Sequence, residues 1–298
     1  MDIQEKFNTM SNSNSNSNSN LSIAQTISQG IFRAYDIRGV VGESLSPNVL
    51  FSIGLALGSE VLAQGDEKIA VGRDGRLSGP SLVKALIEGL RASGVDVVNI
   101  GRVPTPVLYY ATNVLDTTSG VMLTGSHNPV DHNGAKIVIK GRAIYGDEIL
   151  NLYHRIKQEN FSPLYNKHYG KQVGNLERKD LLPEYSERII QDVKLPKKLK
   201  VVVDCGNGIA GVIAPKLLRE IGCEVSELFC EVDGKFPNHH PDPSQEENLQ
   251  DLIQMVHKKG ADIGLAFDGD GDRLGVVTAN GDVIWPDRQL ILYAKKIT

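Results

Sequence analysis

The 298-residue sequence has few cysteines, few aromatic residues and no long apolar run. The three cysteines, Cys205, Cys223 and Cys230, are odd in number and lack the spacing of a CxxC or Cys/His metal site. This excludes a scaffold stapled by disulfides and is typical of reduced thiols in the core of a cytosolic protein. No apolar run reaches roughly 18 residues, and the N-terminus lacks the basic-then-apolar layout of a secretory signal. We therefore expect a cytoplasmic protein without a membrane partner.

An excess of positive charge is also absent. The sequence holds 32 Lys and Arg against 36 Asp and Glu, a net charge of -4. The single dense basic stretch, Lys194 to Lys200, is short and reads as an exposed link. A nucleic-acid partner is not expected, and any bound phosphate has to be held by local cations.

The remaining composition is that of an ordinary globular protein, with 41% hydrophobic and 23% charged residues. Residues 11–20 are an exception, because they alternate Ser and Asn and cannot bury enough surface to offset the entropy of ordering. We predict that residues 1–28 form a disordered tail without chemistry.

Apolar and polar patterning predicts an α/β fold. A strand at Ile69–Val71 is followed by a Gly-containing loop, a helix from Pro80 to Leu90 and a second strand at Val95–Ile100. The same succession recurs between Lys200 and Phe229, which indicates two similar domains.

The domain boundaries follow from breaks in this pattern. Residues 158–180 are polar and interrupted by Pro and Gly, so we place the first domain at 29–165 and the second at 166–280. Residues 281–298 are expected to begin a third domain. A helix predicted over Asp287–Ile297 has an apolar face with no following element to cover it, which suggests a truncated product.

The sequence Asp268-Gly-Asp270-Gly-Asp272-Arg273 directly follows an apolar strand, Ile263–Phe267. Alternate carboxylates project to one side, the glycines let the backbone curl, and oxygen ligands favour magnesium or calcium. An EF-hand is excluded, since its sixth position is Arg273 and its twelfth is Ala279. The alternative is a solvated acidic turn.

A second motif, Thr124-Gly-Ser126-His127-Asn128-Pro129, follows the strand predicted at Gly120–Thr124. A serine after glycine at the end of a strand is exposed for attack. A hydroxyl-stabilised turn leading into Asn-Pro explains the same residues without chemistry.

A third motif, Tyr35-Asp-Ile-Arg38-Gly39, places an arginine early in the chain. A guanidinium grips phosphate oxygens with two parallel hydrogen bonds, although an arginine in a surface salt bridge is commoner.

Together the three motifs resemble the α-D-phosphohexomutase superfamily, and TGSHNP with AYDIRG and DGDGDR is similar to its phosphomannomutase/phosphoglucomutase branch. The resemblance covers most of residues 31–298 and implies repeated mixed-sheet α/β domains. It implies a phosphohexose mutase that interconverts hexose 1-phosphate and hexose 6-phosphate through a phosphoserine and a bisphosphorylated sugar. Gly125 inclines the expected substrate towards mannose and glucose phosphates.

The resemblance also implies the site residues. Ser126 is expected to carry the phosphoryl group and, with Asp268, Asp270 and Asp272, to bind Mg²⁺. Glucose 1,6-bisphosphate is the expected activator and intermediate. Further roles are implied for side chains that orient the substrate or assist proton transfer: Arg38 and Lys136 as catalytic residues, and Tyr35, His127 and Arg273 in substrate binding.

Lys136 could act as a general base only with a lowered pKa. A site with a phosphoserine, three aspartates and one divalent cation carries about -3, so nearby cations are needed.

Rival interpretations remain. Asp268 could be the nucleophile of a Mg²⁺-dependent phosphatase, or the chain could be an inactive sugar-phosphate-binding fragment. Gly206-Asn-Gly208-Ile-Ala-Gly211 fits a dinucleotide fingerprint, with Glu227 near the expected acidic position. His239 and His240 suggest a metal site, but a Pro-rich loop explains them more simply. The sequence leaves the oligomeric state open.

Overall fold

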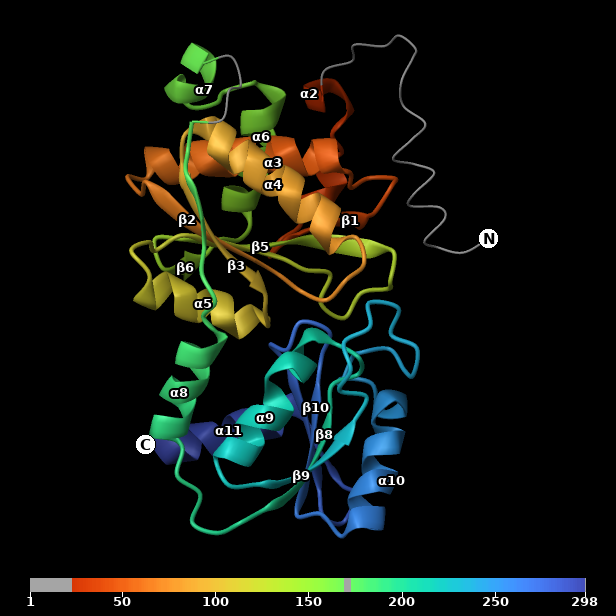
Figure 1. Cartoon of the computed structure of the whole chain (residues 1–298). Coiled ribbons are helices and arrows are strands. Elements are labelled where there is room, and N and C mark those ends of the chain that lie inside the picture. Colours follow the sequence, from red (N-terminus) through yellow and green to blue (C-terminus); the bar gives the residue numbers. More distant parts are fainter. Residues whose placement is uncertain (1–22, 169–172, 298) are drawn as a thin grey trace.

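The computed structural model describes residues 23–168 and 173–297 and arranges them in two α/β units, each built on its own sheet (Figure 1). The first sheet follows the order β1-β5-β4-β2-β3-β7, with β6 paired to β5. Its strands are β1 (Ile37–Val40), β2 (Lys68–Arg73), β3 (Asp96–Arg102), β4 (Gly120–Leu123), β5 (His132–Ile139), β6 (Arg142–Ala143) and β7 (Leu176–Arg178). Strands β4, β2, β3 and β7 are parallel, whereas β1 and β5 run antiparallel to their neighbours. The mixed sheet that the resemblance implied is confirmed.

Helices cover both faces of the first sheet (Figure 1). One face packs against α3 (Pro47–Ala63), α4 (Gly79–Ser93) and α6 (Asp147–Lys157), and the other packs against α5 (Thr105–Val114). The start of α3 shows how local sequence directs this layout, because Ser46 Oγ accepts a hydrogen bond from Val49 N at 3.3 Å and Pro47 fits the first helical position. Two apolar cores result, one on each side of the sheet.

The second sheet has the order β12-β11-β10-β8-β9. Its strands are β8 (Lys200–Asp204), β9 (Glu224–Leu228), β10 (Ile263–Phe267), β11 (Leu274–Thr278) and β12 (Val283–Ile284). Helix α10 (Gln250–Lys259) packs on one face, while α9 (Ala214–Glu220) and the short 3₁₀ helix η2 (Ile209–Val212) lie on the other. The predicted repetition of the α/β pattern is therefore confirmed.

The predicted domain boundaries need two corrections. Residues 23–28, assigned to the tail, contain helix α2 (Ile23–Thr26) and the buried Ile27, which packs in the first core; residues 1–22 lie outside the described part. The boundary near residue 165 is too early, because α7 (Pro163–His168) contacts α4 and β7 pairs with β3. Only then does α8 (Leu182–Asp192) lead to the second unit, contacting both α5 and α9. Polar composition hid a three-residue edge strand that pairs over a long sequence distance.

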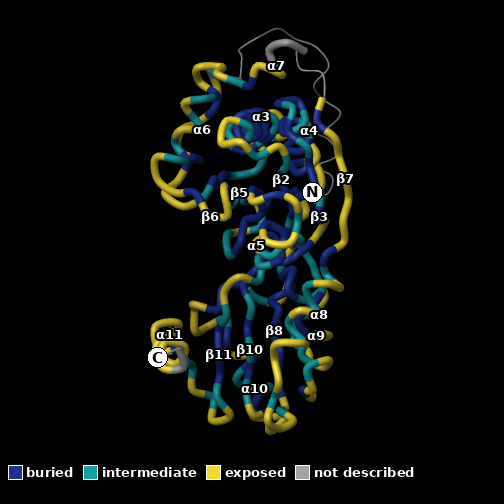
Figure 2. Tube along the Cα trace, turned by 90° about the vertical axis from the view of Figure 1, so that its left-hand side faces the viewer, coloured by how far each residue is buried: buried dark blue, intermediate teal, exposed yellow. Residues whose placement is uncertain are grey.

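The first residues after 280 do not begin a separate domain, contrary to the prediction. Strand β12 belongs to the second sheet, and 3₁₀ helices η1 (Gln29–Ile31) and η3 (Glu246–Leu249) complete the described elements. The predicted terminal helix is present as α11 (Pro286–Ile297), and four consecutive large apolar residues on it are exposed: Leu290, Ile291, Leu292 and Tyr293. Figure 2 shows α11 as an exposed helix beside the second sheet.

Two further features of residues 23–168 and 173–297 concern the helices and the cysteines. None of the helices there is long and apolar enough to cross a membrane. Cys205 and Cys223 are buried, Cys230 is partly buried, and all three thiols are free. They pack in the α9-side core of the second unit, as predicted.

Candidate active site

Two loops, one from each unit, carry the predicted chemistry and meet between the sheets. Ser126 lies just beyond the end of β4, and the three aspartates lie between β10 and β11. Ser126 Oγ donates a hydrogen bond to Asp268 Oδ2 at 2.8 Å, although 142 positions separate the two residues. Both loops follow the carboxyl ends of parallel strands, where binding sites of open α/β sheets commonly form.

The Ser126 backbone adopts a conformation that is unusual for a residue with a side chain. Its φ is +48°, in the left-handed region, and Ser126 is completely buried. Thr124 Oγ1 accepts a hydrogen bond from Ser126 N at 2.8 Å and donates one to Asp74 Oδ2 at 2.8 Å. The expectation of an exposed serine is wrong for this structure, because the aspartate loop of the second unit closes over it. Such strain persists only where neighbouring contacts enforce it, and it is frequent at functional sites.

Arg76, which the sequence interpretation overlooked, holds the serine loop through hydrogen bonds to its backbone carbonyl groups. Its Nη2 donates to the carbonyl oxygens of Ser126 and Asn128 at 2.8 and 2.6 Å, and its Nη1 donates to those of Pro129 and His132 at 2.5 and 3.0 Å. The side chain is 1% exposed. One guanidinium therefore fixes four carbonyl groups of the loop.

Asp74 completes this support. Its carboxylate lies 3.5 Å from Arg76 Nε and accepts hydrogen bonds from the N–H groups of Arg76 and Gly125 at 3.0 and 3.2 Å. Burial raises the pKa of Asp74, against the opposing charge of Arg76. Both residues follow β2, next to β4 in the sheet, so strand order was the signal that could have found them.

Two glycines allow the loops to approach each other and Arg76 closely. A Cβ atom on Gly125 would lie 2.3 Å from Arg76 Nε, and one on Gly269 would lie 2.3 Å from the carbonyl oxygen of Ser126. Any side chain at either position would force the loop or the guanidinium to move. The first glycine of the aspartate motif thus serves packing against the serine loop as well as backbone curvature.

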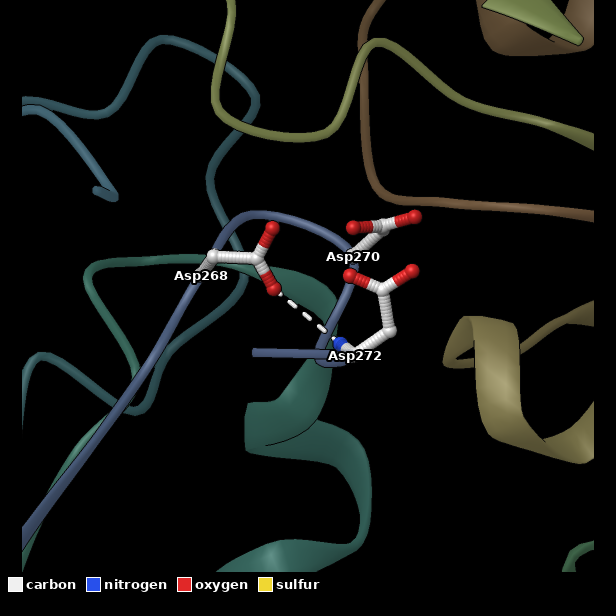
Figure 3. A group of neighbouring side chains, drawn as sticks. All are labelled: Asp268, Asp270 and Asp272. Atoms are coloured by element: carbon white, nitrogen blue, oxygen red, sulfur yellow. Dashed lines mark hydrogen bonds between the residues drawn. The ribbon is translucent and has the colours of Figure 1, made fainter. Parts of the chain in front are cut away.

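The three aspartates form a group that could hold a metal ion. Each offers a carboxylate oxygen, and these oxygens all lie within 4.8 Å of one another. Figure 3 shows the carboxylates gathered around the turn of the loop. Asp268 Oδ1 accepts the N–H groups of Asp272 and Arg273 at 3.0 and 3.1 Å, and Asp270 Oδ1 is buried without a hydrogen-bond partner. An unpaired buried carboxylate oxygen in an oxygen-only donor set fits a hard cation such as Mg²⁺.

The electrostatics of the group point the same way. Burial, followed by the charges of Asp270 and Asp272, raises the pKa of Asp268 well above its usual range. Burial also opposes ionisation of Asp270, but the charge and hydrogen bond of Lys136 lower the pKa of that carboxyl to about 2. The three carboxylates therefore need positive charge nearby to remain ionised together.

Lys136, on β5, lies against this group. Its Nζ donates to Asp270 Oδ2 at 2.7 Å and also to Asp272 Oδ2. Burial alone would lower the pKa of Lys136, but the charges of Asp270 and Asp272 raise it well above its ordinary value. The lowered pKa that a general base requires is therefore not found, and the ammonium form is the one this arrangement favours.

Thr105, at the start of α5, is a further residue that the sequence interpretation missed. Its backbone N donates to the Asp270 carbonyl oxygen at 2.9 Å, and its hydroxyl donates to Asp270 Oδ2 at 2.5 Å. This first-unit residue therefore fixes the middle aspartate of the second unit.

The other predicted site residues differ in how closely they contact the serine loop. Arg38 is buried on β1, donates to Asn128 Oδ1 at 2.6 Å, pairs with Asp36 and has an unpartnered Nε. His127 is half-buried, with Nδ1 3.3 Å from Ser126 Oγ. Burial and then the charge of Arg273 lower the pKa of His127.

Arg273 itself and Tyr35 are more exposed. Arg273 follows the third aspartate directly, and its charge also acts on Asp272. Tyr35 is 81% exposed and lies outside the hydrogen-bonded cluster around Ser126.

The backbone N–H groups of the glycine fingerprint at 206–211 are not arranged to bind a dinucleotide. The N–H groups of Gly206, Gly208 and Ile209 donate to Asp204 Oδ1, Cys205 O and Gly269 O at 2.8, 2.6 and 3.1 Å. They are therefore not directed at a pyrophosphate. The segment supports the aspartate loop instead.

His239 belongs to a structural contact. Its Nε2 lies 3.0 Å from Asp204 Oδ2, and the metal-compatible group found among the described residues contains no histidine. This agrees with the interpretation of the segment as a loop.

Comparisons with known proteins match both units. Residues 29–163 match the family model described as phosphoglucomutase/phosphomannomutase, alpha/beta/alpha domain I, and residues 183–281 match the model for domain II of the same family. The chain is 56% identical over 274 residues to a phosphomannomutase/phosphoglucomutase of Pseudomonas aeruginosa, an alignment that covers 92% of this chain and 58% of that protein. It is 47% identical over 272 residues to a phosphoglucomutase of Neisseria gonorrhoeae, covering 91% of this chain and 58% of that protein.

A solved structure supports the same similarity. The crystal structure of a phosphoglucomutase/phosphomannomutase family protein from Burkholderia thailandensis matches with a TM-score of 0.86 at 53% identity, over 91% of this chain and 59% of that chain. The chain thus spans less than two thirds of the length of these relatives.

Proposed function

Because the chain belongs to the phosphoglucomutase/phosphomannomutase family, we propose that it provides the phosphoryl-carrying part of a mutase that interconverts hexose 1-phosphate and hexose 6-phosphate. Mannose and glucose phosphates are the proposed substrates. The observation that carries the proposal is the 2.8 Å contact between Ser126 Oγ and Asp268, a member of the metal-compatible group. It unites a hydroxyl that can bear a phosphoryl group with carboxylates that can hold a divalent cation.

In the proposed resting state, Ser126 Oγ bears the phosphoryl group. Esterification removes the hydroxyl proton that now bonds to Asp268 Oδ2, so this carboxylate oxygen loses its partner and becomes free to bind a cation. Asp268, Asp270, Asp272 and a phosphoserine oxygen would hold Mg²⁺. Bound there, Mg²⁺ would neutralise charge on the transferring group.

The transfer itself exchanges one phosphorus–oxygen bond for another. A hydroxyl of the hexose monophosphate attacks the phosphorus, the bond to Ser126 Oγ breaks, and a bisphosphorylated sugar forms. The sugar hydroxyl gives its proton to the amine that has just protonated the departing Ser126 Oγ, so the amine ends in its ammonium form and Ser126 Oγ has gained a proton. Lys136, held in its ammonium form by two carboxylates, is the proposed donor of that proton. After the sugar turns, its other phosphoryl group returns to Ser126 by the reverse exchange.

The remaining side chains are proposed to position the substrate. Arg38 has a buried unpartnered Nε and a fixed orientation through Asn128, which suits a guanidinium that orients phosphate oxygens. His127 lies on the serine loop and Arg273 on the aspartate loop, and exposed Tyr35 would meet the sugar from solvent. Glucose 1,6-bisphosphate is the proposed activator that loads Ser126.

The phosphatase alternative receives no support from the site or from the family. An aspartyl nucleophile needs a free carboxylate oxygen, whereas Asp268 accepts two backbone N–H groups on one oxygen and the Ser126 hydroxyl on the other. We further propose the cytoplasm as the location, since the three free thiols suit a reducing compartment.

The test is phosphoryl loading followed by mass spectrometry. The purified chain is incubated with glucose 1,6-bisphosphate and Mg²⁺, and the phosphorylated peptide is identified. We expect one added phosphate on Ser126, absent from Ser126→Ala and present in the control Ser81→Ala, whose serine is exposed on α4.

Phosphate on Asp268 would instead support the phosphatase. Sugar-phosphate binding without loading, in a folded protein that binds Mg²⁺, would contradict the proposed role of Ser126 in this chain and indicate a binding fragment.

A further inference from the structure

A second group of cations lies on the first sheet, on the side of β2 away from β4 and Ser126. Strands β2, β3 and β7 are neighbours and parallel, and each ends on an arginine: Arg73, Arg102 and Arg178. Lys179 follows the last of these. Four cations therefore gather where parallel strands end, an edge at which α/β sheets commonly bind ligands.

A β-bulge aligns two of these arginines. The register between β2 and β3 shifts between Val71 and Gly72, which leaves Ile100 without a partner and places Arg73 directly opposite Arg102. Partners on adjacent parallel strands point to the same face of the sheet, so the two guanidinium groups project together. Without the extra residue, Arg102 would point to the opposite face.

The third arginine faces the same way. Val71 pairs with Asn99, and Asn99 pairs with Arg178, so these three residues share a face. Arg73 lies two residues beyond Val71 and therefore also projects to that face. Figure 2 shows β7 as an exposed edge strand beside β3. Arg102 and Arg178 are exposed, and Arg73 is partly buried.

These side chains line an open cavity of about 440 Å³, a size that suits a small-molecule ligand. Apolar side chains of Val83, Val103 and Leu182 form part of its wall. The cavity thus offers both cations for an anionic group and apolar surface for a carbon skeleton.

The cations of this cavity have no direct carboxylate partner in the part of the chain that the structure describes. Over residues 23–168 and 173–297, none of Arg73, Arg102, Arg178 and Lys179 forms an ion pair with a carboxylate. The acid in the lining, Asp180, accepts the backbone N–H of Leu182 at 3.1 Å and so caps the start of α8. Burial and then the charge of Arg102 lower the pKa of Arg73, while the charge of Asp74 acts in the opposite direction. Arg73 Nη1 also donates to the Asp74 carbonyl oxygen at 2.9 Å.

We propose that this cavity is a binding site for a small molecule that carries a diphosphate group, with Arg73, Arg102 and Arg178 gripping the phosphate oxygens. Guanidinium groups match phosphate oxygens with paired hydrogen bonds, and three or four cations balance the charge of a diphosphate. The apolar wall contacts the remainder of the ligand. The site is separate from Ser126 and does not rest on the proposed mutase activity.

The proposal is tested with inorganic pyrophosphate as the probe, without Mg²⁺ and at 150 mM NaCl. Deuterated, ¹⁵N-labelled protein is titrated while the backbone amide signals are followed by NMR. We expect saturable shifts at Gly101 and Lys179 on the arginine edge. Arg102→Gln and Arg178→Gln should each weaken this binding at least about tenfold, because each removes charge-assisted hydrogen bonds. Both side chains are exposed, so thermal unfolding should stay unchanged.

Two controls separate this site from general attraction and from the Ser126 region. Lys216→Gln removes the same charge from an exposed position on α9 and should leave pyrophosphate binding intact. Arg38→Gln should leave the shifts at Gly101 and Lys179 unaltered. Shifts confined to the Ser126 and Asp268 loops, or equal weakening by Lys216→Gln, would overturn the proposal.

Discussion

Replacing Arg76 with lysine should disable the serine loop, because no other side chain has the shape to hold four carbonyl groups at once. The guanidinium makes its four bonds through two nitrogens that diverge, at 2.5 to 3.0 Å. A lysine has a single nitrogen with three donors and cannot reach all four oxygens. At least one of the four carbonyl groups would lose its partner, and the bond to the Ser126 carbonyl oxygen is buried.

The magnitude follows from these contacts. A hydrogen bond to a charged group contributes about 1.5 to 3 kcal/mol to stability. The ammonium group of the new lysine would make some hydrogen bonds of its own, which offset part of this loss. We expect Arg76→Lys to lower the free energy of unfolding by about 3 kcal/mol. Arg76→Ala should lower it by about 3 to 5 kcal/mol, since it also leaves Asp74 buried without a counter-ion.

Two measurements check this expectation. Equilibrium urea unfolding followed by circular dichroism gives the change in free energy, and hydrogen exchange reports the protection of amides in residues 124–132. Arg188→Lys is the matched control, because Arg188 is 59% exposed and pairs with Asp192 on its own helix. Its change should stay within about 0.5 kcal/mol.

The loss at Arg76 should also appear in function. Ser126 should accept phosphate more slowly in Arg76→Lys, even at temperatures where the variant is folded. A variant that loses less than about 1 kcal/mol, keeps amide protection and loads Ser126 at the wild-type rate would refute the anchoring role of the guanidinium.

Three further predictions concern neighbouring features. Gly125→Ala should destabilise the protein by about 1 to 3 kcal/mol and slow Ser126 loading, because its Cβ would lie 2.3 Å from the Arg76 guanidinium; Gly30→Ala, at an exposed glycine, should do neither. Mg²⁺ at a hundredfold excess over its dissociation constant should stabilise the wild type by about 2.7 kcal/mol in thermal or urea unfolding, and Asp272→Asn should greatly reduce this gain. A wild-type protein indifferent to Mg²⁺ would count against the metal site. Burial opposes the charged form of His239, but contacts with Asp204 raise the pKa of this residue. The stability that protonated His239 contributes should therefore be complete below about pH 6.5, the pKa of an unfolded His, and decline as pH rises through the higher folded pKa. His239→Gln should flatten that part of the stability–pH curve, and an unchanged curve would exclude His239 as its source.

Much of the fold was readable from the sequence, since strand and helix signals are local. Between Ile69 and Ile100, Gly and Pro residues separate apolar runs whose lengths suit a strand, a helix and a strand. The observed β2, α4 and β3 cover nearly all the residues of these three predicted elements. Ser126 and the aspartates were found for the same reason, because each motif is continuous and follows an apolar strand.

Long-range pairing was not readable. Strand β7 has three exposed residues and no hydrophobic alternation, so only its hydrogen bonds to β3 identify it as part of the first sheet. The prediction that residues 23–28 belong to the tail is wrong for the same reason, because Ile27 is buried by helices distant in sequence.

By itself the sequence determined the α/β class, the repeated unit and the two loops that carry the chemistry, because these depend on neighbouring residues. The tertiary structure decided which side chains serve those loops. The sequence around Arg76 and Thr105 contains no motif that marks either residue. Strand order brings Arg76 to Ser126, and the contact between the two units brings Thr105 to Asp270. Likewise the raised pKa of Lys136 and the shared face of Arg73 and Arg102 arise from burial and register, which no local pattern encodes.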